Sequence, residues 1–358
     1  MWRGRGALAP TLPQLIAGES AGLRQTQRMQ SRSKQEKLPI RWRRRVLGVT
    51  GLLAGLFMGM NGVAFFHARA MTRFVSGGQR TPDPDHLDWR LRTATLVFGV
   101  TLTRPVNDRF PNDLGMDFRT VRIPSDGDLE AWWIPAASAR GTVLLFHGYG
   151  ESKKQVLLTA RRFWGLGFQC LLVDFRGAGG SEGDRTTLGF SEARDVAAAV
   201  RWIGREAGDE RPVLYGFSMG GAAVLRAVAL EGIRPRAVVV EAVFDRMLTT
   251  VEHRFDIMHV PSFPMARLLV FWGGVQNGFD AFSHNPSDYA ANVQCPTMVL
   301  HGELDERVTV REARAIHDAL AGPKVLRVLP GAGHEASQGI SDSAWIALIA
   351  PFLAAAEP

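Results

Sequence analysis

The stretch PVLYGFSMGGAAVLRAVAL, residues 212–230, decides the fold of this 358-residue chain. An apolar run typical of a buried strand leads directly into an apolar helix, and residues 216–220 (GFSMG) at the junction fit the pattern G-x-S-x-G. Small residues around Ser218 permit a sharp strand-to-helix turn, which strains the serine backbone and lifts its hydroxyl clear of the sheet. The pattern therefore predicts a nucleophilic serine at the carboxyl end of a strand.

Apolar runs like this one recur along the chain and predict eight strands in all. The later runs are nearly unbroken, which is typical of parallel strands buried on both faces. Helical patterns alternate with them, so residues 113–358 are predicted to form one doubly wound α/β domain with a mostly parallel sheet and helices on both faces. The expected strands are 119–124, 129–136, 142–146, 169–175, 212–217, 237–244, 297–301 and 324–329, and the expected helices are 153–166, 191–206, 219–231, 310–321 and 341–355.

One connection is too long for a simple crossover. About 50 residues separate the sixth strand from the seventh, where a dozen or so would suffice. The segment at about 245–292 contains Phe255, Leu269 and Trp272 among other apolar residues, and it is too apolar for a solvated loop. We expect a small helical cap over the edge of the sheet where ligands bind; the alternative is a helix that merely thickens the domain.

A serine hydroxyl needs a neighbouring base, and that base needs an acid to orient it. Asp305 follows the seventh predicted strand, and His334 follows the eighth. The carboxyl ends of parallel strands share one edge of the sheet with the turn at Ser218, so the three side chains are expected to meet there. Glu303 is an alternative to Asp305 as the acid.

A tetrahedral intermediate also needs hydrogen-bond donors for its oxyanion. One donor is expected to be the backbone N–H of Met219, the residue after the nucleophile. The other is expected in the loop after the third strand, where residues 147–150 read HGYG. Glycines on both sides of Tyr149 permit close approach of the backbone, which makes the Tyr149 N–H the second candidate.

These motifs together resemble the α/β-hydrolase superfamily, specifically its serine-aminopeptidase-like, often membrane-anchored hydrolases. The resemblance implies the α/β-hydrolase fold, with a cap after the sixth strand. It also implies that Ser218 is the nucleophile, His334 the general base and acid, Asp305 the orienting acid, and Tyr149 and Met219 the oxyanion hole. The resemblance extends over about residues 117–352 and rests on HGYG at 147–150, DFRGAGGS at 174–181, GFSMGG at 216–221, HGELDERV at 301–308 and GAGH at 331–334.

An apolar stretch near the N-terminus predicts a membrane anchor. Residues 46–66 (VLGVTGLLAGLFMGMNGVAFF) contain 21 positions without a charge, enough for a helix of roughly 30 Å, the thickness of a bilayer's hydrocarbon core. The sequence Ala68-Arg69-Ala70 could instead end a cleaved signal peptide, but the apolar stretch exceeds the 7–15 residues usual for one. We expect an uncleaved signal anchor, followed by a linker and irregular lead-in at 67–112.

Charge is concentrated before this stretch. Residues 1–45 carry eleven basic side chains against two acidic ones, a net charge of +9, which leaves −2 of the total +7 for the rest of the chain. The positive-inside rule then predicts a cytoplasmic N-terminus and an extracytoplasmic globular domain. A globular part that is not basic argues against a nucleic-acid partner. The tail itself is expected to be disordered.

No cofactor or metal is expected. His253, His259 and His284 lie in the predicted cap without a carboxylate or cysteine at ligand spacing. His147 and His301, which precede glycines at strand ends, are expected to shape loops. If the strands follow the order of the family, the strands of the two cysteines, Cys170 and Cys295, are four places apart, about 19 Å, and both should be buried free thiols.

These observations lead to a membrane-anchored serine hydrolase that cleaves a carboxylic ester or thioester through an acyl-enzyme. The expected partners are a small acyl ester or lipid-like substrate and the membrane. A serine peptidase of the same mechanism is the first alternative, and a catalytically silent binding module is a distant one. The fold hosts many activities, so the sequence leaves acyl-chain length, leaving group and oligomeric state open.

Overall fold

The structure is a computed structural model that describes residues 40–82 and 87–356. The chain divides after Leu53 into two units. The N-terminal part of helix α1 belongs to the first unit, and everything from Ala54 onward, including the sheet, belongs to the second.

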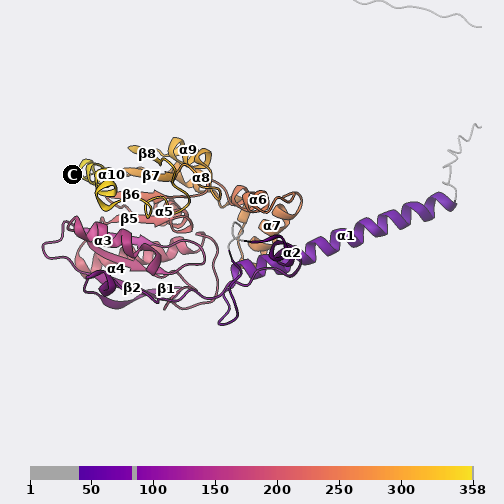
Figure 1. Cartoon of the computed structure of the whole chain (residues 1–358), viewed down its shortest axis with the longest axis horizontal. Coiled ribbons are helices and arrows are strands. Elements are labelled where there is room, and N and C mark those ends of the chain that lie inside the picture. Colours follow the sequence, from indigo (N-terminus) through magenta and orange to yellow (C-terminus); the bar gives the residue numbers. More distant parts are fainter. Residues whose placement is uncertain (1–39, 83–86, 357–358) are drawn as a thin grey trace, which may run out of the picture. The chain divides into compact units, whose positions relative to one another are not determined.

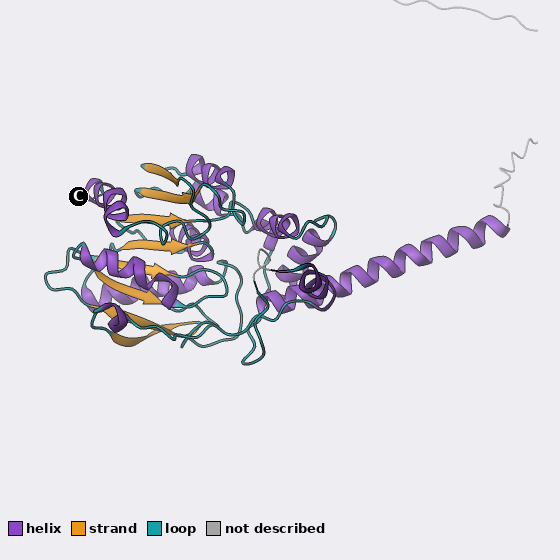
Figure 2. Ribbon diagram, in the orientation of Figure 1, coloured by secondary structure: helices purple, strands orange, loops and turns teal. Residues whose placement is uncertain are grey.

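The second unit is built on one eight-stranded sheet (Figures 1 and 2). The strand order is β1-β2-β4-β3-β5-β6-β7-β8. β1 pairs antiparallel with β2 and β2 with β4, and all the other pairs are parallel. The eight mostly parallel strands expected from the sequence are confirmed. Their bounds are β1 Arg119–Ser125, β2 Gly127–Ile134, β3 Thr142–Phe146, β4 Gln169–Val173, β5 Val213–Phe217, β6 Ala237–Glu241, β7 Thr297–Gly302 and β8 Lys324–Leu329.

Helices cover both faces of this sheet because successive strand residues point to opposite sides, and both sides are apolar. Leu144 and Phe146 of β3 pack in one core cluster, whereas Val143 and Leu145 of the same strand pack in the other. The first cluster lies under α4 (Glu192–Ala207), α5 (Met219–Leu230) and α9 (Val310–Ala319); the second lies under η3 (Lys153–Val156), α3 (Leu157–Gly165) and α10 (Asp342–Ala355).

The ends of elements differ from the expected ones where the backbone turns. The run 237–244 was expected to be a single strand, but β6 ends at Glu241 because Ala242 takes a left-handed conformation with φ of 55°. Cys170 lies buried in β4, and Cys295 lies half-buried just before β7, four positions away in the sheet. Both are free thiols, although Cys295 is less buried than expected.

The long connection between β6 and β7 folds into short helices, as the sequence indicates for a cap. Phe255, Leu269 and Val270 of these helices join the core cluster that contains α5. The cap is therefore packed onto the domain. Its elements are α6 (Met247–Ile257), α7 (Met265–Asn277), η4 (Ala281–Ser283) and α8 (Pro286–Ala290).

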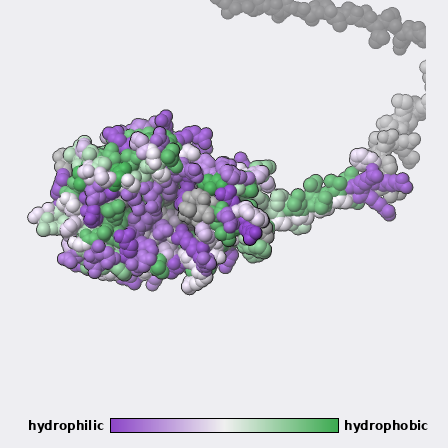
Figure 3. Space-filling model, in the orientation of Figure 1, coloured by the Kyte–Doolittle hydropathy of each residue, from purple (hydrophilic) through white to green (hydrophobic). Residues whose placement is uncertain are grey.

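The N-terminal helix is longer than the apolar stretch that predicts it. α1 spans Ile40–Thr72 and is long and apolar enough to cross a membrane. Figure 3 shows apolar surface along its exposed length and hydrophilic side chains at its N-terminal end. The described part of the segment expected to be a linker and irregular lead-in contains α2 (Trp89–Phe98), which the Asp88 side chain caps by accepting from the Leu91 N–H. The short helix η2 (Pro111–Leu114) begins at the end of that segment.

Candidate active site

Ser218 occupies a strained turn between β5 and α5. Its backbone has φ of 49° and ψ of −114°, a conformation that L-residues rarely adopt. Two hydrogen bonds hold it there: the Ser218 N–H donates to Glu241 O at 2.7 Å, and the Ala222 N–H donates to Ser218 O at 3.1 Å. The serine therefore stands at the carboxyl end of β5 and at the positive end of the α5 dipole, which favours negative charge.

The glycines of the G-x-S-x-G pattern are required by close backbone approach. A Cβ on Gly220 would lie 2.4 Å from the carbonyl oxygen of Phe146, at the end of the neighbouring strand β3. A Cβ on Gly216 would lie 2.6 Å from the carbonyl carbon of Gly220. No side chain fits at either position, so α5 packs directly against the end of β3 and brings Ser218 beside the loop after that strand.

The structure brings His334 and Asp305 into direct contact. His334 Nδ1 lies 2.7 Å from Asp305 Oδ2, and the Asp305 side chain is fully buried. Its other oxygen, Oδ1, accepts the N–H groups of Arg307 at 2.9 Å and Val308 at 3.0 Å. Burial alone would raise the pKa of Asp305, but the His334 hydrogen bond, the His334 charge and these backbone donors outweigh it and hold the pKa below its usual value.

An ionised carboxylate only accepts hydrogen bonds, so His334 must carry its proton on Nδ1. The lone pair of the opposite ring nitrogen, Nε2, is then available to a hydroxyl group. Ser218 and His334 line the same cavity, of about 90 Å³, together with Gly148 and Tyr149. Two of the three residues expected to meet at the sheet edge, Ser218 and His334, thus line one cavity, and Asp305 contacts His334 without lining that cavity.

Both candidate oxyanion donors lie at this cavity or next to it. Met219 is the first residue of α5, and the N–H of a helix's first residue has no acceptor within the helix. Tyr149 lies between Gly148 and Gly150, and Gly150 has φ of 70°. The Tyr149 hydroxyl donates to the Met71 carbonyl at 2.6 Å, so this loop is bonded to the end of α1.

Glu303, the alternative to Asp305, and the histidine His147 make hydrogen bonds within loops instead. Glu303 is exposed and accepts from the Gly331 N–H at 2.9 Å, whereas Asp305 contacts the imidazole. His147 is buried; its Nδ1–H donates to Gly148 O, and its Nε2 accepts from the Phe175 N–H at 3.0 Å. Burial lowers the pKa of His147, which keeps it neutral.

His301 stabilises the loop after β7, because its Nε2–H donates to the Val308 carbonyl at 2.9 Å. His284, in the cap, is buried between the Tyr289 hydroxyl and the Leu188 carbonyl. Among the residues that the structure describes, no three His, Cys, Asp or Glu side chains are grouped to hold a metal ion.

Sequence reasoning missed a buried carboxylate behind the site. Glu241, at the end of β6, accepts from the Tyr215 hydroxyl at 2.6 Å and from the Ser337 N–H at 2.8 Å. Burial raises the pKa of Glu241. Since the Glu241 carbonyl also accepts from the Ser218 N–H, this residue links the nucleophile turn to the loop that carries His334. A single glutamate at the end of an apolar run was the signal that could have revealed it.

A buried ion cluster supports the loop after β4. Lys153 is fully buried and forms ion pairs with Asp174 and, at 2.8 Å, with Glu130. Its ammonium group also lies 4.5 Å from the centroid of a Trp132 ring. Asp174 begins the glycine-rich run DFRGAGGS at 174–181, and its side chain also accepts from the Gly180 N–H. No periodicity distinguishes Lys153 from a surface lysine.

Part of the chain is similar in sequence to known proteins. Residues 137–257 match the family model of the serine aminopeptidases, S33. The chain is 30% identical over 210 residues to an uncharacterised protein of Mycobacterium tuberculosis, covering 58% of this chain and 68% of that protein. It is 28% identical over 240 residues to a monoacylglycerol lipase of Mycolicibacterium smegmatis, covering 57% of this chain and 84% of the lipase.

A solved structure has the same fold. The Pyrococcus furiosus esterase Pf2001 superposes with a TM-score of 0.60 at 23% identity, covering 70% of this chain and 95% of the esterase. The eight-stranded sheet, the serine turn after β5 and these similarities define one class of protein. The chain belongs to the α/β-hydrolase superfamily, and it is a hydrolase of that fold.

Proposed function

We propose that this chain is a membrane-anchored serine hydrolase that cleaves carboxylic esters or thioesters through an acyl-enzyme. One observation carries the proposal: the strained Ser218 shares a cavity with His334, whose Nδ1 is hydrogen-bonded to the buried Asp305 at 2.7 Å. This order of nucleophile, base and acid is the one that activates a serine hydroxyl.

The proposed reaction has two halves. Ser218 Oγ attacks the carbonyl carbon of the substrate while His334 Nε2 takes the hydroxyl proton, and Asp305 stabilises the resulting imidazolium. The N–H groups of Tyr149 and Met219 stabilise the oxyanion, and collapse of the intermediate transfers the proton from His334 to the leaving alcohol or thiol. A water molecule then repeats the sequence on the acyl-serine, releasing the carboxylic acid and regenerating Ser218.

A substrate screen on the full chain in detergent tests this proposal. We expect Ser218-dependent turnover of p-nitrophenyl esters and of the matching thioesters. Ser218→Ala should lower kcat by at least about 10⁴-fold, whereas Ser343→Ala, an exposed serine at the start of α10, should leave it unchanged. Turnover that survives Ser218→Ala would refute the assignment. Folded protein that turns over no substrate and binds no serine-directed probe would favour the silent binding module.

A serine peptidase is the second candidate, favoured by the description of the matching family model. Two carboxylates line the Ser218 cavity, Glu151 and Glu335, and a carboxylate is the group that would recognise a peptide's terminal ammonium. Glu151 is paired with Arg80 at 3.3 Å, and Glu335 accepts from the Gln155 amide at 3.1 Å. Cleavage of aminoacyl anilides without cleavage of esters, lost in Glu335→Gln, would establish this candidate instead.

The membrane part of the proposal rests on α1 and on the charges around it. We infer a tail at 1–45, a membrane span at 46–66 that is not cleaved, and a hydrolase domain at 113–358 on the extracytoplasmic side. A C-terminal alkaline phosphatase fusion should then be active and a C-terminal β-galactosidase fusion inactive. The reverse pattern would overturn the orientation, and a mature chain that begins near residue 71 would overturn the anchor.

A further inference from the structure

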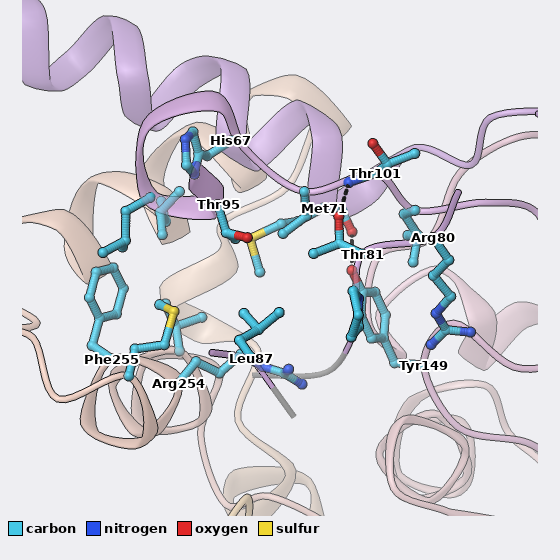
Figure 4. Close-up of a pocket in the computed structure, with 17 residues that line it drawn as sticks. His67, Met71, Arg80, Thr81, Leu87, Thr95, Thr101, Tyr149, Arg254 and Phe255 are labelled. Atoms are coloured by element: carbon cyan, nitrogen blue, oxygen red, sulfur yellow. Dashed lines mark hydrogen bonds between the residues drawn. The ribbon is translucent and has the colours of Figure 1, made fainter. Parts of the chain in front are cut away.

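A second cavity lies beside the Ser218 site and is mainly apolar (Figure 4). It has a volume of about 110 Å³ and lies between the C-terminal end of α1, residues 80–82 and 87–102, Tyr149 of the loop after β3 and the cap helices α6 and α7. Its walls therefore come from parts of the second unit that lie far apart in the sequence. Most of its lining side chains are apolar, among them Met71, Leu96, Val251, Phe255, Met258 and Leu269.

This cavity adjoins the candidate active site. Arg80, Tyr149 and Arg254 line both the apolar cavity and the cavity that contains Ser218. The Arg254 guanidinium lies 5.8 Å from the centroid of the Tyr149 ring, and the Tyr149 hydroxyl is bonded to Met71 at the end of α1. Tyr149 thus borders both spaces.

The C-terminal end of α1 is bound to the cap that forms the opposite wall. The Trp272 Nε1–H of α7 donates to Asn61 Oδ1 at 3.2 Å, and the Gln276 amide donates to the Phe65 carbonyl at 2.8 Å. The rings of Phe65 and Trp272 pack edge to face at 5.3 Å. These contacts hold α7 against the last turns of the apolar helix, so the cavity forms where that helix joins the domain.

Large apolar side chains remain exposed around this junction. Phe66 of α1 is 67% exposed, Phe271 of α7 is 47% exposed and Phe98 of α2 is 86% exposed. They come from α1, α7 and α2, three of the four helices that contribute lining residues to the cavity. Exposed apolar groups next to an apolar helix of membrane-spanning length are typical of a surface that contacts a bilayer.

We propose that the apolar cavity binds the acyl chain of a membrane lipid ester, with the ester carbonyl at Ser218 and the chain passing Tyr149. This inference rests on the proposed function and specifies its substrate class: a lipid with one long acyl chain that reaches the site from the bilayer. The end of the anchor helix then serves as part of the binding site. Each methylene that the cavity buries should raise kcat/KM about fourfold, from the free energy of transferring one CH₂ group out of water.

Two substitutions on α2 test the proposal in the full chain reconstituted in phosphatidylcholine vesicles. Thr95 lines the cavity, whereas Thr93 of the same helix is exposed. The readout is the ratio of kcat/KM for p-nitrophenyl dodecanoate to that for p-nitrophenyl acetate. If the indole of Thr95→Trp excludes three methylenes, this ratio falls about 60-fold, and Thr93→Trp leaves it within twofold of wild type. Met258→Trp, at a second lining residue, should lower the ratio in the same way.

A binding measurement separates failure of this inference from failure of the proposed function. Decanoate should bind the Ser218→Ala chain in calorimetry and bind the Ser218→Ala/Thr95→Trp chain at least tenfold more weakly. Equal decanoate affinity in these two chains, or a dodecanoate-to-acetate ratio that Thr95→Trp and Met258→Trp do not change, would overturn the acyl subsite even if Ser218 proves catalytic. Decanoate binding sensitive to Thr95→Trp in a chain without turnover would keep the subsite and refute the hydrolase.

Discussion

Asp305→Asn should abolish turnover while leaving the fold in place. The asparagine oxygen can still accept the Arg307 and Val308 N–H groups, which Asp305 Oδ1 accepts at 2.9 and 3.0 Å. Oδ2, however, becomes an NH₂ group 2.7 Å from His334 Nδ1, and two donors cannot share that position. The imidazole must then place its proton on Nε2, where it can no longer accept the proton of Ser218.

The expected loss of kcat in Asp305→Asn follows from the change in the tautomer of His334. Exchange of the triad carboxylate for an amide lowers kcat by about 10⁴-fold, or about 5.4 kcal/mol of transition-state stabilisation. The free energy of unfolding should fall by only about 1.5–3 kcal/mol, the contribution of one hydrogen bond to a charged group. Ester hydrolysis at pH 7.5, together with urea unfolding of the same preparation, measures both quantities.

Glu303→Gln provides the matched control, because it makes the same chemical change two residues away. Glu303 is exposed and contacts the Gly331 N–H. We expect this variant to keep kcat within threefold of wild type. An Asp305→Asn chain with more than a tenth of wild-type activity would refute the reasoning, and so would a Glu303→Gln chain that loses activity by 10⁴-fold.

Three further predictions concern stability. Gly220→Ala places a Cβ 2.4 Å from the Phe146 carbonyl and should lower the free energy of unfolding by more than about 3 kcal/mol; a change below 1 kcal/mol in urea would contradict the close approach. Lys153→Met leaves Asp174 buried and charged without its ammonium partner, so Tm should fall by about 10 °C, and an unchanged Tm in calorimetry would contradict a structural role. Burial lowers the pKa of His284 from 6.5 to about 4, so its contribution to stability is complete above about pH 6.5 and is lost as the pH falls toward 4. Wild type should therefore lose about 2–3 kcal/mol more than His284→Gln between pH 7 and pH 4.5, and equal losses would contradict a neutral buried imidazole.

The sheet and the edge that carries the candidate site could be predicted from the sequence because both depend on local patterns. The apolar run 142–146 coincides with β3, since a strand buried on both faces has no polar position to obscure it. Ser218, Asp305 and His334 each follow such a run. Parallel strands bring those positions to one edge whatever the details of the loops.

The apolar cavity, helix α2 and the burial of Lys153 and Glu241 could not be predicted, because most of these features depend on contacts between distant segments. The apolar cavity combines residues from 67 to 269, and the sequence of residues 67–82 and 87–102 alone does not indicate that they line a cavity. Helix α2 was not predicted, because prolines and polar residues surround it in the sequence, although Asp88 is a recognisable N-cap. The burial of Lys153 and Glu241 follows from partners that lie 21 or more positions away, which no periodicity reveals.

The most direct test of a nucleophilic Ser218 is labelling of the full-length chain by a fluorophosphonate probe, followed by mapping of the labelled peptide. The account predicts one adduct, on Ser218, that is absent in Ser218→Ala and at least about a hundredfold slower to form in Asp305→Asn. An adduct on another serine, or a folded chain that the probe does not label, would contradict it.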